Sequence, residues 1–179
     1  MQVYDNLASP SAPYVMFTNA NNFRSSYCNT DEHGFRYTWS KEGWLDYGEF
    51  QNKEGAKGCF FGGSTIFGVG ASHDSKTIPS LLNLQSDTTW FNFGNRAFNS
   101  TQEVLLYEMF LPETEKVVLF TGLNNLMTHL ESPDFMKYYG SFFDEIGFYD
   151  RTQRPLSLDS LRRFVPGWLK RGAQLQRHF

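Results

Sequence analysis

The stretch KGCFFG at residues 57–62, continued by GSTIFGVG at residues 63–70, decides the fold class of this chain. A short apolar run that ends in glycine is typical of a strand buried on both faces of a parallel sheet. The glycines that follow predict a turn, and Ser64 stands at its start. A serine in this position suits either a plain loop or a nucleophile held at the end of a strand.

Two more strands and two helices follow in alternation. TTWFNFG at residues 88–94 and EKVVLFTG at residues 115–122 read as strands. TIPSLLNL, from a Thr77 cap, and NSTQEVLLYEMFLP, with a capping box from Ser100 to Glu103, read as helices. This order predicts an α/β fold, a three-layer α/β/α sandwich on a parallel, flavodoxin-like sheet of which three strands are identifiable.

The flanking segments are less regular. Residues 1–56 predict a loop-rich extension that packs on the core, and residues 57–179 the α/β domain itself. SLDSLRRFVPGWLKRG at residues 157–172 predicts a helix on both sides of Pro166. The arginines and lysines of residues 151–179 form a solvated face, a docking surface for an anionic partner, or part of a helix cut from its domain.

Composition excludes several classes of protein. The chain has 179 residues and a net charge of -3, which predicts one globular domain without a nucleic-acid footprint. Two cysteines make no disulfide framework; Cys59 reads as core and Cys28 as loop. We expect a cytoplasmic protein, since no signal peptide and no membrane span are visible.

The glycine-rich turn does not match the known phosphate-binding patterns. It contains neither Gly-Lys-[Ser/Thr] nor Gly-x-Gly-x-x-Gly, so no nucleotide cofactor is expected. Cysteines and histidines are scattered without ligand spacing, so no metal is expected either.

The residues that follow the three strands form one chemical set. Ligands of open parallel sheets bind outside the carboxyl ends of the strands. Ser64, Gly94 and Asn124 lie there, and a nucleophile with two donors is what acyl transfer requires. Taken singly, Ser64 could cap a helix, Gly94 could permit a positive φ, and Asn124 could be a left-handed turn residue.

Three stretches resemble the ordered sequence blocks of the SGNH hydrolase superfamily, the GDSL-like esterases and lipases: FGGSTIFGVGASHDSKTIPSLL, NFGNRAFNSTQE and LFTGLNNL. The upstream stretch EHGFR also resembles that family. The resemblance implies that Ser64 is the nucleophile, Gly94 an oxyanion N–H donor and Asn124 the oxyanion amide. It also implies a serine esterase that acts on a small acyl ester, such as an O-acetylated carbohydrate.

The chain departs from that family in two places. Asn125 stands where the family has aspartate, and the closing Asp-x-x-His block, which supplies the base, is missing. The chain is then a shortened or N-terminal piece, or a non-catalytic binding module. His73 and His129 are the candidate replacement bases, oriented by Asp74 or Glu131.

Overall fold

The structure, a computed structural model, describes residue 4 and residues 6–131. The chain divides into two units, Met1–Leu130 and Glu131–Phe179. Beyond Glu131, the second unit lies outside the described residues. The helix expected at residues 157–172 and the basic cluster around it therefore lie there too.

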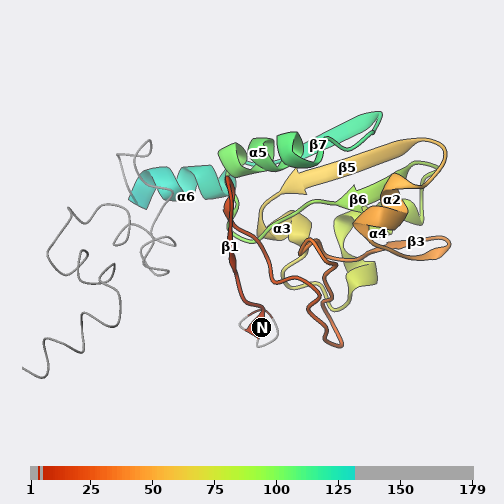
Figure 1. The fold of residues 1–179 in the computed structure, drawn as a ribbon, viewed down its shortest axis with the longest axis horizontal. Coiled ribbons are helices and arrows are strands. Elements are labelled where there is room, and N and C mark those ends of the chain that lie inside the picture. The colour runs from red at the N-terminus through yellow and green to blue at the C-terminus, as the bar shows by residue number, and fades with distance from the viewer. Residues whose placement is uncertain (1–3, 5, 132–179) are drawn as a thin grey trace, which may run out of the picture. The chain divides into compact units, whose positions relative to one another are not determined.

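A three-stranded parallel sheet forms the centre of the described unit (Figure 1). Its strands are β5 (Lys57–Gly62), β6 (Thr89–Asn92) and β7 (Lys116–Phe120), in the order β6-β5-β7. Cys59 is opposite Phe91 on one side and Val117 on the other. All three predicted strands and the mixed α/β class are confirmed.

Helices connect the strands. Between β5 and β6 lie α3 (Ser64–Phe67), the 3-10 turn η1 (Asp74–Lys76) and α4 (Ile78–Asn83). The crossover from β6 to β7 is α5 (Ser100–Phe110), and α6 (Leu123–Glu131) follows β7. In the described residues no helix has the length and apolar character needed to cross a membrane.

The predicted capping box of α5 was wrong by one residue. Asn99, in extended conformation, is the N-cap, and its side chain accepts from Gln102 N while Gln102 reaches back to the Asn99 N–H. Ser100 is already helical. Because Gln102 completes the box, Glu103 is not used for capping. Thr77 is the N-cap residue of α4, as predicted, although its hydroxyl bonds Asp74 O instead.

The described N-terminal residues form short hairpins, in keeping with the short extended pieces expected in this segment, and helix α2, which the sequence did not predict. β1 (Ser11–Ala12) pairs with β2 (Met16–Phe17), β3 (Thr38–Ser40) pairs with β4 (Gly43–Leu45), and α2 (Tyr47–Gln51) follows. These elements are short and lack a sustained period, so packing rather than local pattern defines them.

Two arginines, the buried Arg36 and the half-buried Arg96, anchor this segment to the α/β unit. Arg36 pairs with Asp74 at 2.6 Å and donates to Gly68 O at the end of α3. Arg96, in the loop after β6, donates to Asn19 Oδ1 at 2.9 Å and to Tyr4 O at 2.8 Å.

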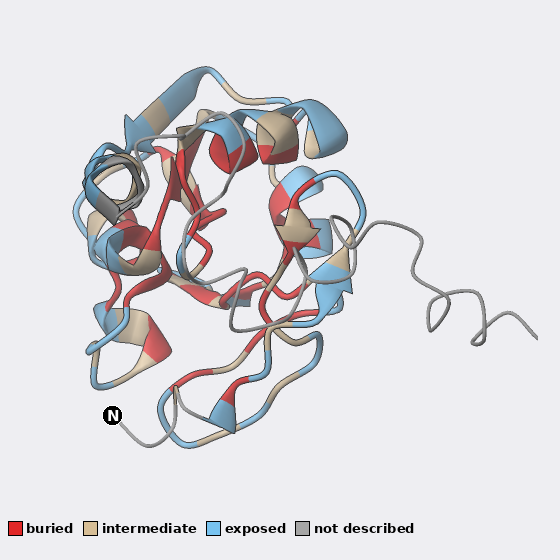
Figure 2. Ribbon diagram, turned by 90° about the vertical axis from the view of Figure 1, so that its left-hand side faces the viewer, coloured by how far each residue is buried: buried red, intermediate tan, exposed pale blue. Residues whose placement is uncertain are grey.

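Both faces of β5 are buried, as the apolar run predicted. Adjacent side chains of a strand point to opposite faces. On one face Phe61 stacks on Phe93, with ring centroids 4.7 Å apart; on the other, Phe60 packs against Trp90 at 5.0 Å. Figure 2 shows this buried centre, in red, inside a largely exposed outer layer.

β7 lies at one edge of the described sheet, and its side chains, unlike those of β5 and β6, are largely exposed. Leu119 is 53 % exposed and Phe120 55 %. An apolar parallel strand is normally covered on both faces.

Candidate functional site

A small pocket lies at the carboxyl ends of β5 and β7. Its volume is about 50 Å³, and it is lined by residues of three separate segments, including Ser64, Phe98, Glu103, Thr121 and Asn124. The parallel arrangement explains this meeting, because the residues that follow parallel strands emerge at the same edge of the sheet.

Ser64 is the first residue of α3, and Gly63 is its N-cap, so Ser64 does not cap the helix. The side chain is half-buried, and its hydroxyl has no hydrogen-bond partner among residues 4 and 6–131. Gly62 lies so close to Ile66 that a Cβ there would come within 2.6 Å of Ile66 Cγ1. The turn is thus tightly packed around the serine rather than loose.

Asn124 lies beside the serine turn. It is in the first turn of α6, not in a left-handed turn, and its Nδ2 donates to Phe98 O at 2.6 Å. A Cβ added at Gly63 would come within 2.5 Å of this same nitrogen. The structure therefore brings the predicted nucleophile and the predicted oxyanion amide together.

Asn125, where the resemblance led us to expect aspartate, has a structural role. Its Oδ1 accepts from Ser100 N at 3.0 Å, and its Nδ2 donates to Ser100 Oγ at 2.7 Å. An amide can donate and accept at once, whereas a carboxylate only accepts. Asn125 thereby joins the start of α6 to the start of α5.

Gly94 occupies a different position from the one expected of an oxyanion donor. It packs on α3, where an added Cβ would lie 2.2 Å from Phe67 N, and its φ is not positive. Its N–H donates to Asn92 Oδ1 at 2.9 Å, and Gly94 does not line the pocket. The structure gives Gly94 a packing role, and its oxyanion role stays a prediction.

His73 is directed away from the candidate site. Its Nδ1 lies 2.9 Å from Ser75 Oγ, and its ring lies 5.3 Å from that of Trp44. Asp74, which we expected to orient it, is instead paired with Arg36 at 2.6 Å. His73 does not line the pocket that contains Ser64.

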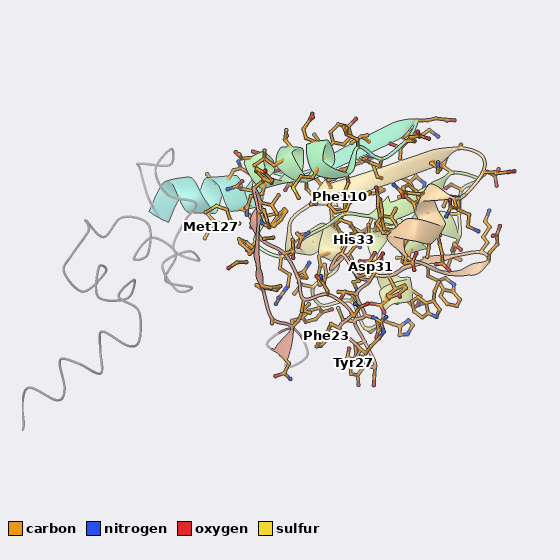
Figure 3. All side chains as sticks on the ribbon, viewed as in Figure 1. Phe23, Tyr27, Asp31, His33, Phe110 and Met127 are labelled. Atoms are coloured by element: carbon orange, nitrogen blue, oxygen red, sulfur yellow. The ribbon has the colours of Figure 1, made fainter. Side chains whose placement is uncertain are left out.

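The other histidines supply no described base either. His33 packs among aromatic rings, 5.3 Å from Phe110, and Figure 3 shows it with Asp31 and Phe110, far from Met127 on α6. His129 is a residue of α6, but its side chain is outside the description, as is that of Glu131.

Glu103 is the pocket residue that the sequence analysis missed. It is 2 % exposed, and neither carboxyl oxygen has a hydrogen-bond partner in the described structure. Burial raises the pKa of its carboxyl to about 7. A hydrogen bond from the nearby Thr121 hydroxyl would lower this pKa, but that hydroxyl donates to Asn125 Oδ1 at 3.3 Å. The available signal was an acidic residue beside Gln102 and Leu106 on the buried face of α5.

Among the described residues there is no group of three or more side chains that could hold a metal ion. No protein-family model matches the chain, and no curated protein matches it. The chemical capacity of the pocket follows from its own residues: a serine hydroxyl that can attack, an amide that can donate and a carboxyl that can exchange a proton.

Proposed function

We propose that the chain is a serine esterase or acyl hydrolase of the SGNH type, which acts on a small acyl ester through an acyl-enzyme on Ser64. The observation that supports this is the meeting of Ser64 and Asn124, from turns 60 residues apart in sequence, in one pocket. The same proposal includes the three-layer α/β/α sandwich implied by the resemblance.

The size of the pocket favours a short acyl group. A volume of about 50 Å³ has room for a few water molecules or an acetyl group. An O-acetylated carbohydrate is the substrate class we propose. The two free buried cysteines suit a reducing, cytoplasmic location.

In this mechanism the Ser64 oxygen attacks the acyl carbon, and negative charge develops on the carbonyl oxygen. The Asn124 amide and the Ser64 N–H are the proposed donors to that oxygen, each donor of this kind being worth about 10²–10³ in kcat. Gly94 could contribute only if its N–H left Asn92 Oδ1.

The direct test is labelling with a fluorophosphonate, mapped by peptide mass spectrometry. We expect an adduct on Ser64 that is absent from Ser64→Ala, and faster hydrolysis of nitrophenyl acetate than of nitrophenyl octanoate. Well-folded protein that takes up no label at Ser64 would contradict the proposal.

A second candidate function is a binding module that keeps the pocket but not the turnover. It is favoured by the positions of His33 and His73, neither of which lines the pocket. Calorimetry with an acetylated sugar separates the two functions: binding without hydrolysis and without labelling supports the module.

The exposed edge of β7 favours a third candidate, a fragment whose missing segment would cover this edge and restore the activity. Amide hydrogen exchange tests it. Protected outer N–H groups on Val118 and Phe120 would show a further strand, and rapid exchange would show an open edge.

A further inference from the structure

Glu103 differs from the polar residue next to it in having no structural partner. Gln102, also buried, donates from Nε2 to Val15 O at 2.8 Å and accepts from Asn99 N at 3.2 Å. Both Glu103 oxygens lack a hydrogen bond within the described part of the chain. An unpaired buried carboxyl costs several kcal/mol in general, so folds normally pair or replace it.

The position of Glu103 indicates a functional reason for keeping this unpaired carboxyl. Glu103 lines the same pocket as three other parts of the chain: the turn after β5 with Ser64 and Thr65, the end of β7 with Thr121, and the first turn of α6 with Asn124. Among the described residues that line the pocket, no other side chain carries a charge, so Glu103 is the one carboxyl in this described lining.

We propose that Glu103 is the proton acceptor for the Ser64 hydroxyl and takes the part that a histidine plays in other serine hydrolases. This inference rests on the proposed function and supplies the base that the chain otherwise lacks among its described pocket residues.

The proton and electron movements balance. As the Ser64 oxygen forms its bond to the acyl carbon, the hydroxyl proton moves to a Glu103 oxygen and the carbonyl π electrons move to the carbonyl oxygen. When the tetrahedral intermediate collapses, the bond to the alcohol breaks and the proton passes from Glu103 to the departing oxygen. Water then repeats both steps on the acyl-enzyme, with Glu103 again as acceptor and donor.

The acidity of Glu103 suits this work. A general base is most effective when its pKa lies near the working pH, and enzymes raise glutamates to about 6–7 by burial for this purpose. Burial raises the pKa of Glu103 to about 7.

The test is the pH dependence of the rate at which the fluorophosphonate labels Ser64. Glu103→Gln keeps the shape of the side chain and removes the base, and Glu103→Asp keeps a carboxyl but withdraws it by one methylene. Glu108→Gln is the matched control, since Glu108 is an exposed residue of the same helix.

We expect the wild-type rate to rise with pH to a plateau, with a midpoint near pH 7. Glu103→Gln should reduce the plateau rate by about 10²-fold or more and abolish the midpoint near pH 7. Glu103→Asp should retain the midpoint at a reduced rate. Glu108→Gln should match the wild type. A Glu103→Gln protein that labels with the wild-type rate and profile overturns the inference alone. Wild-type protein that labels at no pH overturns the proposed function and the inference together.

A measurement on the wild type covers the case in which the variants do not fold. Carbon-13 NMR of protein labelled at glutamate should show one carboxyl that titrates near pH 7, and its midpoint should move when Ser64 is phosphonylated. The absence of such a carboxyl also overturns the inference.

Discussion

The amide nitrogen of Asn124 lies against the α-carbon of Gly63, so closely that a Cβ at residue 63 would come within 2.5 Å of it. The next contact of that Cβ, with Phe98 O, would be a tolerable 3.4 Å. Glycine at position 63 therefore determines where the Asn124 side chain can lie. Because glycine has no Cβ, the proposed oxyanion amide of Asn124 can lie beside Ser64.

Gly63→Ala should separate the site from the fold. The clash falls on the end of a side chain, which can rotate away, so we expect a stability loss of about 1 kcal/mol or less. The rotation should break the Asn124–Phe98 hydrogen bond. The loss in stability stays small because an intramolecular hydrogen bond contributes only about 0.5–1.5 kcal/mol net. Fluorophosphonate labelling of Ser64 should fall by about tenfold or more, measured beside urea denaturation. Unchanged labelling would contradict the role given to Asn124.

Gly94→Ala, in contrast to Gly63→Ala, should strongly destabilise the fold. Its Cβ would meet the backbone of α3, at 2.2 Å from Phe67 N and 2.6 Å from Ile66 C, and backbone in a packed turn cannot rotate away. We expect a loss of about 3 kcal/mol or more in the free energy of unfolding, at the upper end of overpacking effects.

Gly48→Ala is the control for that measurement. Gly48 lies in α2, and its nearest contact with an added Cβ would be Asp46 Oδ1 at 3.5 Å. Alanine in a helix is favoured over glycine by about 0.5–1 kcal/mol, so this variant should be neutral or stabilised. Equal behaviour of the two variants would show that close packing of Gly94 on α3 is not important.

Glu103 should make stability depend on pH in a defined direction. Its folded-state pKa of about 7 is above the ordinary value of 4.5, so the folded protein holds a proton that the unfolded chain has lost. This contribution is complete below pH 4.5 and is lost as the pH rises through 7. On the order of 2–3 kcal/mol should disappear between pH 4.5 and 8.

Glu103→Gln isolates that effect. The variant should lack this part of the pH dependence, so the difference in unfolding free energy between variant and wild type should increase in favour of the variant from pH 5 to pH 8. Guanidinium titrations at several pH values measure it. Parallel curves for the two proteins would mean that the carboxyl is hydrated or paired.

The pair of Arg36 and Asp74 should be the most sensitive link between the N-terminal segment and the α/β unit. Both side chains are fully buried and joined at 2.6 Å. Arg36→Ala should cost about 3–5 kcal/mol, because it leaves an unpaired buried carboxylate. Adding Asp74→Asn to it should recover part of the loss in a double-mutant cycle, which purely additive losses would contradict.

The two cysteines should be unreactive in the folded protein. Burial raises the pKa of both Cys28 and Cys59 to about 11, so little thiolate exists at pH 8. Iodoacetamide followed by mass spectrometry should find both unmodified until denaturant is added. Rapid alkylation of Cys28 alone would show that the loop around it opens.

Local pattern was sufficient for the elements that make up the sheet. The apolar run of β5, the aromatic and β-branched residues of β6 and β7, and the order of strand and helix predicted a parallel α/β sheet, because such residues are typical of buried strands. The same order placed Ser64 and Asn124 at one edge, as the structure finds. The family resemblance and the esterase function stay predictions.

Tertiary structure decided what depends on contacts between distant residues. Pattern placed the α5 cap one residue late and treated Glu103 as a capping residue, because Asn99 and Ser100 are about equally good N-cap residues. Asp74 lies next to His73 in sequence but bonds Arg36, from 38 residues away. Sequence alone therefore determined which residues reach the edge of the sheet. Packing decided which of them meet, because burial and hydrogen bonding depend on neighbours that no local pattern specifies.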